Sequence, residues 1–296
     1  EISLITSDSR QVIPGALFVA YRGVGADGHR YIPDALARGA VAVVVEEKPD
    51  KSRPPTKLAR PVRFDEVATI IVGDGRAALA HLHAAWFGHP SRSMTVVGVT
   101  GTDGKTTTSN LIYSILKAAG VRAGMITTVN AVIGGETYDT GLHTTTPDAV
   151  DAQRYLAQMR DAGTEIAVLE TTSHGLAQHR VTGIEFDVAV ITNITHEHLD
   201  FHGSYEGYRD AKAMLFRSLM DARARGEARD GAEGGETPPL QIAGERRGEV
   251  SSPSPSGARK SQVKTAVLNA DDSSYAYLSR IPAERYVVYT AGADAV

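Results

Sequence analysis

The sequence contains no cysteine, few aromatic residues and no long apolar run. Among its 296 residues, Phe, Trp and Tyr together make up 6%. The lack of cysteine excludes disulfide bonds and thiolate zinc sites. No apolar stretch approaches the roughly 20 residues that a membrane helix requires. With a formal net charge of -4, the chain also lacks the basic balance typical of nucleic-acid-binding proteins.

What remains is the composition of an ordinary globular protein, with 42% hydrophobic and 22% charged residues. We therefore expect a cytoplasmic protein that neither inserts into a membrane nor binds nucleic acid, and no feature indicates an obligate protein partner. The length favours two domains over one. Short β-branched apolar runs alternate with helix-like segments, which is typical of the α/β class.

The pattern changes near residue 92, so we predict a small N-terminal α/β domain over 1–91 and a larger central domain over 92–296. In the first domain the expected strands are 16–21, 40–47 and 69–72, and the expected helices are 31–40 and 75–88. In the second, the expected strands are 94–100, 165–170, 187–193, 264–269 and 285–289. Strands separated by helices predict a mostly parallel sheet flanked by helices.

Two details of the central domain can be predicted from periodicity and composition. The segment 107–120 reads as a helix that ends at Gly120, with Leu111, Ile112, Ile115 and Leu116 as its inward stripe. Residues 222–262 are rich in Gly, Pro, Ser, Arg and Glu and contain few large apolar side chains. Such a segment cannot bury enough apolar surface to order itself, so we expect a disordered insertion.

The stretch "GVTGTDGKTTT" (98–108) predicts a P-loop-type site for the phosphates of ATP. It lies between an expected strand and an expected helix, although the first glycine of the strict motif is displaced by one position, to Gly98. Backbone N–H groups at a helix start favour an anion, the lysine would contact the β/γ-phosphates, and the first threonine after it would bind Mg²⁺. The alternative is a glycine-rich turn without a ligand. The predicted ATP-binding residues here are Gly101, Thr102, Gly104, Lys105, Thr106 and Thr107.

Two further polar groups follow expected strands of the central domain. Glu170 ends the strand 165–170, where ligands of open α/β sheets gather, so we expect it to hold a metal ion on the nucleotide. A solvent-facing carboxylate is the alternative. Residues 192–203 contain His196, His198 and His202. Alternating histidines are compatible with zinc, but a triphosphate site favours Mg²⁺ and oxygen ligands, so most of these histidines are expected to fix the loop.

These motifs, in this order, resemble the Mur ligases, the ATP-dependent amide-bond ligases of peptidoglycan precursor synthesis. Residues 6–44 resemble the family's N-terminal domain, which binds the UDP of the substrate. The later matching segments are "HTTTPD" (143–148), "ETTSHGLAQHR" (170–180), "NITHEHLDFHGSYEGYRDAKAMLF" (193–216) and "LNADD" (268–272). Within the family, "ETTSHGLAQHR" favours the ligase that adds a diamino acid.

The resemblance implies roles for individual residues. In the N-terminal domain, Ser9 and Arg10 match the UDP-binding turn, and Asp27, Gly28 and His29 match a second loop. The residues implied to contact the muramoyl-dipeptide are Thr145, Thr146, Thr172, Gln178 and Arg180. Asn269 and Asp272 match the region that holds adenosine. The implied metal ligands are Thr106, Glu170, His198 and Lys212, and the implied catalytic residues are Lys105, Glu170, His198 and Lys212.

Lys212 matches the lysine that this family carbamylates with CO₂. A carbamate replaces a cation by an anion on a long stem, so it could help to hold a second Mg²⁺, whereas an ammonium near Lys105 would repel the ions. From the residues alone, an exposed helix lysine is the alternative. The implied cofactors are thus ATP, two Mg²⁺ ions and the CO₂-derived carbamate.

The sequence departs from the family pattern at several places. Asp103 stands where the family more often has Asn, Glu197 stands where it often has Asp, and the segment 222–262 is not a family feature. The resemblance also implies a third, C-terminal ligase domain, which we do not find within these residues.

The implied reaction is ADP-forming ligation of a diamino acid, meso-diaminopimelate or L-lysine, to UDP-N-acetylmuramoyl-L-alanyl-D-glutamate through an acyl phosphate. The alternatives are another ligation step of the same family, a P-loop GTPase or motor ATPase, and a fragment that binds nucleotide without catalysis.

Overall fold

The computed structural model describes residues 2–23, 25–47, 67–139, 146–227 and 262–290. These residues form two compact units, one up to Trp86 and the other from Phe87 onward. No helix in the described part of the chain is long and apolar enough to cross a lipid bilayer. The predicted substrate contact Thr145 and most of the predicted insertion lie outside the described residues.

The first unit is a four-stranded sheet with one helix on each face. Its strands pair in the order β1-β2-β3-β4, and all pairs are parallel. Helix α1 (Ile32–Ala37) packs on one face, where Phe18, Val43 and Val45 are buried, and α2 (Gly75–Trp86) covers the other. The strands are β1 (Ile5–Thr6), β2 (Leu17–Val19), β3 (Ala42–Val45) and β4 (Ala68–Ile71).

The second unit is built on an eight-stranded sheet in the order β12-β11-β10-β5-β9-β6-β7-β8. The pairs from β12 to β6 are parallel, and β7 and β8 add an antiparallel edge. The strands are β5 (Thr95–Thr100), β6 (Ala123–Ile126), β7 (Asn130–Ile133), β8 (Glu136–Asp139), β9 (Ile166–Glu170), β10 (Val188–Ile191), β11 (Thr265–Asn269) and β12 (Arg285–Tyr289). The expected α/β class with a mostly parallel, helix-flanked sheet is therefore confirmed.

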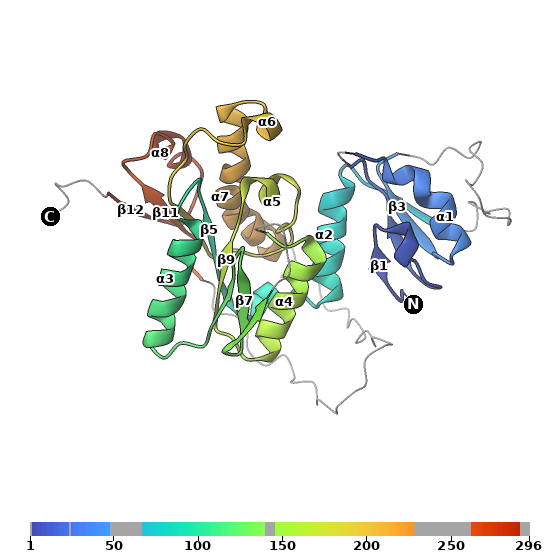
Figure 1. The fold of residues 1–296 in the computed structure, drawn as a ribbon, viewed down its shortest axis with the longest axis horizontal. Helices are drawn as coiled ribbons and strands as arrows, with labels where there is room; N and C mark the ends of the chain where they lie inside the picture. Colours follow the sequence, from blue (N-terminus) through green and yellow to red (C-terminus); the bar gives the residue numbers. More distant parts are fainter. Residues whose placement is uncertain (1, 24, 48–66, 140–145, 228–261, 291–296) are drawn as a thin grey trace. The chain divides into compact units, whose positions relative to one another are not determined.

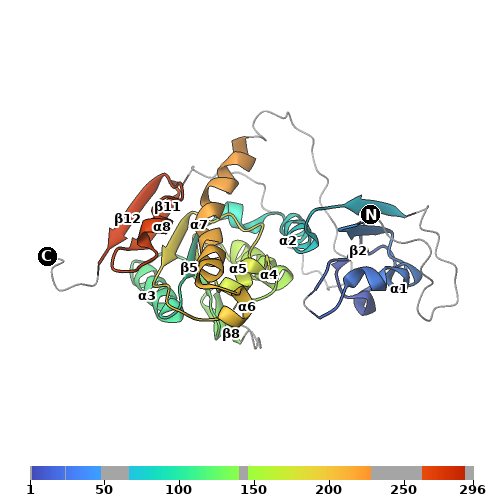
Figure 2. The same cartoon turned by 90° about the horizontal axis from the view of Figure 1, so that it is seen from above.

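Helices cover both faces of this sheet (Figures 1 and 2). Helix α3 lies over one face, and α4 and α7 contribute to the core on the other face. The alternating strand residues explain this division, since Val97 and Val99 of β5 point to the α3 side and Val96 points to the other. The helices of the unit are α3 (Lys105–Ala118), α4 (Ala149–Asp161), α5 (Ser173–Ala177), α6 (Leu199–His202), α7 (Tyr205–Glu227) and α8 (Tyr275–Leu278).

The predicted inward stripe of α3 is half wrong. Ile112 and Leu116 pack on the core, but Leu111 is 58% exposed and Ile115 67% exposed. Tyr113 and the buried Ser109 complete the inward face instead. The spacing 109, 112, 113, 116 keeps one helical face, whereas a choice based only on apolar letters mixed two faces. Gly120 does follow the helix, with φ of 76°.

The predicted insertion begins too early. Residues 222–227 continue helix α7 to Glu227, so the loop-like composition assigned from 222 onward includes one and a half turns of helix. Arg and Ala are good helix formers and can extend a helix whose core contacts lie further back. The sequence reading also missed β6, β7 and β8, whose short runs lie among glycines and threonines.

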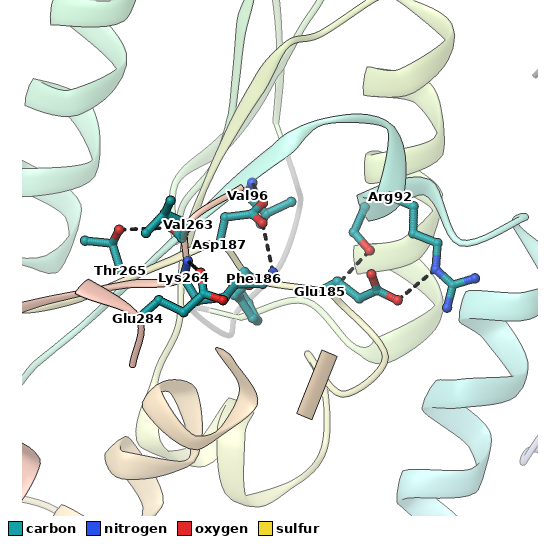
Figure 3. Close-up of polar contacts among 10 residues, drawn as sticks. Arg92, Val96, Glu185, Phe186, Asp187, Val263, Lys264, Thr265 and Glu284 are labelled. Carbon is teal, nitrogen blue, oxygen red and sulfur yellow. Dashed lines mark hydrogen bonds and ion pairs between the residues drawn. The ribbon is translucent and has the colours of Figure 1, made fainter. Parts of the chain in front are cut away.

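A buried ion pair connects the amino ends of three neighbouring strands (Figure 3). Lys264, just before β11, donates from Nζ to Asp187 Oδ1 at 2.9 Å and to the Phe186 carbonyl at 2.8 Å. Asp187, just before β10, accepts the Val96 N–H of β5 at 2.9 Å through its other oxygen. The pair therefore helps to set the register of β5, β10 and β11, at the end of the sheet opposite the loops described next.

Candidate functional site

The loop between β5 and α3, residues 101–104, leads into a helix start, the kind of turn that favours an anion, and we call it the anion loop. Gly101 and Gly104 both have positive φ, 152° and 77°. A Cβ on Gly101 would lie 1.8 Å from Thr192 Oγ1, so any larger residue here would force Thr192 to shift. Thr192 Oγ1 itself donates to the Asp103 carbonyl at 2.6 Å. The first turn of α3, which includes Thr107, presents backbone N–H groups that have no partner within the helix.

Thr102 is the best-connected residue of this loop. Its N–H donates to the Asn193 carbonyl at 2.8 Å, and its carbonyl accepts Lys105 Nζ at 2.6 Å. Its hydroxyl accepts the Thr195 N–H at 2.9 Å and lies 3.1 Å from the Tyr208 hydroxyl. Segments that follow β5 and β10 thus hold each other, because these strands are neighbours in the sheet.

Glu170 lies beside the helix start, as the sequence predicts for a carboxylate at the end of β9. It is 2% exposed, and its Oε2 accepts the Thr106 hydroxyl at 2.9 Å and the Thr128 N–H at 3.2 Å. A carboxylate and a hydroxyl this close provide the oxygen donors that Mg²⁺ prefers. Within the described residues, no three His, Asp or Glu side chains converge as a metal site. A magnesium ion at this pair would need its remaining ligands from water or phosphate.

Lys212 is buried in α7, not exposed, with 1% of its surface accessible. Its Nζ donates to the Gly101 carbonyl at 2.6 Å and lies 4.4 Å from the centre of the Tyr208 ring. Burial, with the positive charge of Lys105 second, lowers the pKa of Lys212 to about 7, although Glu197 and Asp103 act in the opposite direction. The surroundings of Lys212 therefore favour the neutral amine over the ammonium more than water does.

Histidine and aromatic rings form a cluster beside Lys212. The His174 ring lies 4.8 Å from His198, 5.4 Å from His202 and 4.2 Å from Phe201, measured between centroids. Burial, and then the neighbouring histidines, lowers the pKa of both His174 and His202. His198 has a left-handed φ of 53° and an exposed side chain. His174 was not among the predicted site residues.

Asn269, the last residue of β11, and Asp272, which follows it, are predicted to lie near adenosine and contact the neighbouring loop. Asn269 Nδ2 donates to the Thr192 carbonyl at 2.8 Å, and Asp272 Oδ2 accepts the Ile194 N–H at 2.8 Å. Both side chains therefore shape the segment after β10 that in turn holds the anion loop.

The predicted dipeptide-contact residues that the structure describes form one network. Thr146 Oγ1 accepts the Thr172 N–H and lies 3.0 Å from Thr172 Oγ1. Arg180 donates from one guanidinium nitrogen to the Thr146 carbonyl at 2.8 Å and from two others to Gln178 Oε1 at 3.1 and 2.7 Å. Gln178 uses its carbonyl oxygen in this network, so its amide group is oriented by Arg180.

In the first unit, the predicted UDP-binding residues lie in two short 3₁₀ turns. Asp8 caps the first turn, which begins at Ser9, and forms an ion pair with the exposed Arg10 at 2.8 Å. Asp27 caps the second and accepts His29 Nδ1 at 2.7 Å, while His29 Nε2 accepts the Glu46 N–H at 3.0 Å. Both ring nitrogens of His29 are therefore used within the unit, which favours a role in shaping the loop.

A phosphate-type loop at a central strand, with a hydroxyl–carboxylate pair at the next strand end, defines a P-loop-type nucleotide-binding protein of the α/β class. Comparison with protein-family models identifies the family within this class. The model of the Mur ligase family, catalytic domain, matches residues 1–86, and the model of the Mur ligase middle domain matches residues 99–224. The chain belongs to the Mur ligase family.

Curated relatives extend this result. The chain is 48% identical over 223 residues to "UDP-N-acetylmuramyl-tripeptide synthetase" of Roseiflexus sp. (strain RS-1), covering 75% of this chain and 42% of the relative. It is 34% identical over 295 residues to "UDP-N-acetylmuramoyl-L-alanyl-D-glutamate--2,6-diaminopimelate ligase" of Bacillus licheniformis, covering 100% of this chain and 50% of the relative. The chain thus spans about half the length of the curated relatives it matches.

Solved structures share the fold. A structure described as "UDP-N-acetylmuramoyl-L-alanyl-D-glutamate--2, 6-diaminopimelate ligase" superposes with a TM-score of 0.66 and 24% identity, covering 100% of this chain and 50% of that one. MurF from Acinetobacter baumannii superposes with a TM-score of 0.51 and 20% identity, covering 98% and 48%. At these identities the comparison supports the fold alone.

Proposed function

We propose that this chain is the substrate-binding and nucleotide-binding part of an ATP-dependent ligase that adds a diamino acid to UDP-N-acetylmuramoyl-L-alanyl-D-glutamate. The observation that carries the proposal is the pairing of Thr106 with the buried Glu170 beside the Gly101–Gly104 turn, in a chain whose curated relatives bear that name. ATP and the UDP-linked precursor are cytoplasmic metabolites, so we place its action in the cytoplasm. The diamino acid is meso-diaminopimelate or L-lysine.

In this proposal the anion loop holds the phosphates of ATP. Lys105, now bonded to the Thr102 carbonyl, would turn to the β/γ-phosphates, and the N–H groups of the first turn of α3 would bind their oxygens. Thr106 and Glu170 would hold Mg²⁺, which when bound neutralises charge on the phosphoryl oxygens. Asn269 and Asp272 support the loop against which the nucleoside would lie.

Carbamylation of Lys212 is part of the proposal. The Lys212 ammonium first loses a proton. The neutral amine would then attack the carbon of CO₂, forming a C–N bond as one C=O π bond opens onto oxygen, and would lose a second proton, so that the cation becomes an anion. Burial favours the first part of this change, because it disfavours the ammonium and lowers the pKa of Lys212 to about 7, which supplies the neutral amine. The carbamate, with His198 on the adjacent segment, would provide ligands for a second Mg²⁺.

The chemical sequence follows from the substrates. An oxygen of the terminal D-Glu carboxylate attacks the γ-phosphorus of ATP, the bond from that phosphorus to the β-phosphate oxygen breaks, and ADP leaves. The acyl phosphate then accepts the amine of the diamino acid at its carbonyl carbon. The carbon–oxygen bond breaks, phosphate leaves, and the amine loses a proton. Lys105 and the N–H groups at the start of α3 would stabilise charge on the transferring phosphoryl group.

The muramoyl-dipeptide would contact the network of Thr146, Thr172, Gln178 and Arg180, to which the sequence adds Thr145. The amide donors of Gln178 and the guanidinium of Arg180 suit the carboxylates of this substrate. In the first unit, Ser9, Arg10 and the loop shaped by Asp27 and His29 would hold the UDP group.

The experiment that tests the proposal has two levels. First, binding of a fluorescent ATP analogue to this chain is titrated with and without Mg²⁺, and binding of the UDP-linked precursor is measured by calorimetry. We expect Mg²⁺-dependent binding of the nucleotide and no competition by GTP at equal concentration. Second, ADP release and amide formation are followed with meso-diaminopimelate, L-lysine, D-glutamate and D-alanyl-D-alanine, in this chain and in a version extended by a C-terminal ligase domain. Failure of both versions with both diamino acids would refute the assignment.

A further inference from the structure

Tyr208 is a buried tyrosine with two separate polar contacts. Its side chain is 1% exposed and ranks among the largest fully buried side chains of the described residues. The hydroxyl lies 3.1 Å from Thr102 Oγ1, and the ring centre lies 4.4 Å from Lys212 Nζ. Burial raises the pKa of the Tyr208 phenol, so the hydroxyl stays protonated. One residue therefore contacts both the anion loop and the lysine of the second proposed metal site.

The hydroxyl and the ring of Tyr208 each contact a residue that is hydrogen-bonded to the anion loop or belongs to it. Its hydroxyl contacts the side-chain hydroxyl of Thr102. The backbone carbonyl of the same residue accepts a hydrogen bond from Lys105 Nζ. Its ring forms a wall beside Lys212, whose Nζ holds the Gly101 carbonyl at 2.6 Å. Adjacent loop residues are thus tied to one helix, α7, through a direct hydroxyl contact and through the lysine that the ring covers.

We propose that Tyr208 is a positioning residue that sets the spacing between the anion loop and the Lys212 nitrogen. The inference rests on the proposed function, in which that loop binds ATP and that nitrogen carries the carbamate. The hydroxyl keeps Thr102 in place for nucleotide binding, and the ring excludes water from one side of the carbamylation site. Neither part of Tyr208 reacts.

Because the hydroxyl and the ring of Tyr208 have separate roles, two substitutions at this residue should have different effects. Tyr208→Phe keeps the ring and removes the hydroxyl, so nucleotide affinity should fall about fivefold, the effect of one hydrogen bond, while carbamylation is unchanged. Tyr208→Leu also removes the wall beside Lys212, so both nucleotide binding and carbamylation should fall. A residue that only stabilised the fold would change neither measurement in the folded protein.

Tyr205 provides a matched control on the same helix. Its hydroxyl also makes one hydrogen-bond contact to a hydroxyl, with Ser273 Oγ at 3.1 Å, but it contacts neither Thr102 nor Lys212 in the structure. Tyr205→Phe therefore removes an equivalent atom one turn away. A second check is the pair Thr102→Val and Tyr208→Phe, since removing both hydroxyls should lower affinity no further than the more damaging single change.

The experiment measures two quantities on this 296-residue chain and its variants. Affinity for a fluorescent ATP analogue with Mg²⁺ reports the loop, and the carbamate signal in ¹³C NMR with labelled bicarbonate reports Lys212. A fivefold loss in Tyr208→Phe, with the carbamate signal intact and Tyr205→Phe like the parent, would support the inference. Parent-like affinity in Tyr208→Phe, or equal losses in both Phe variants, would overturn it.

The Leu variant and the parent separate the remaining outcomes. A full carbamate signal in a folded Tyr208→Leu variant would overturn the role of the ring. If the parent chain itself shows neither nucleotide binding nor a carbamate, the proposed function fails, and this inference fails with it. If the parent shows both and the variants match it, only the inference about Tyr208 fails.

Discussion

Lys212 should make the stability of the central unit depend on pH in a direction that an ordinary lysine would not. Its ammonium is almost fully buried, and burial lowers its pKa from 10.5 to about 7. At pH values below about 7 the lysine is charged in both folded and unfolded chains, so the full cost of burial is present. Between about 7 and about 10.5 the unfolded chain binds more protons than the folded one, so stability rises with pH.

The magnitude follows from linkage. One proton taken up on unfolding changes the free energy of unfolding by about 1.4 kcal/mol per pH unit. Allowing for partial titration near pH 7, we expect a rise of roughly 2 kcal/mol between about pH 7 and about pH 9. Lys212→Met keeps the length of the side chain and removes the titrating group, so the variant should lack this part of the pH dependence.

The assay is urea unfolding followed by far-UV circular dichroism, in CO₂-free buffers so that no carbamate replaces the amine. The quantity compared is the difference in unfolding free energy between parent and Lys212→Met at each pH, because other titrating groups contribute equally to both. Lys117→Met, at an exposed lysine of α3, is the matched control and should run parallel to the parent. A constant difference between parent and Lys212→Met across this range would refute the reasoning.

Three further predictions concern the loop, the metal pair and the strand register. Gly101→Ala should reduce nucleotide affinity at least tenfold by titration, because its Cβ would meet Thr192 Oγ1 at 1.8 Å; unchanged affinity would contradict the loop geometry. Glu170→Gln should bind ATP about tenfold more weakly than the parent in the presence of Mg²⁺, and with the same affinity as the parent in EDTA. An equal loss of affinity in both buffers would argue against a metal ion at this carboxylate. Asp187→Asn leaves the buried Lys264 without its counter-charge and should lower the unfolding free energy by about 3 kcal/mol in urea titrations, and an unchanged midpoint would show that the pair contributes little.

Continuous apolar runs in the sequence predicted the buried strands of the central sheet. The runs that became β5, β9, β10 and β11 are apolar because both faces of those strands are covered, and they were found within one or two residues. Strands β7 and β8 form the antiparallel edge, and neither contains a long apolar run: β7 reads NAVI, and β8, exposed throughout, reads ETYD. On α3, the inward positions of Ser109 and Tyr113 show why apolar letters alone misplace a helix face.

The sequence named candidate residues for the site, without His174 and Tyr208, but it did not give their contacts. Thr106 and Glu170 are 64 residues apart, and Thr102 and Tyr208 are 106 apart. They meet because β5 lies between β9 and β10, an order that the chain reaches only by crossing over. A motif reports which residue types follow each strand, while the strand order decides which of them become neighbours.

The sequence by itself therefore determined the backbone shape of the loop between β5 and α3, because glycines between a strand and a helix act through local geometry. Only the tertiary structure decided that Lys212 is buried at the Gly101 carbonyl and covered by Tyr208, since burial depends on the packing of α7 against β5 and β10. An exposed lysine and a buried one look the same in a helical sequence, and their chemistry differs because water solvates one ammonium and is excluded from the other.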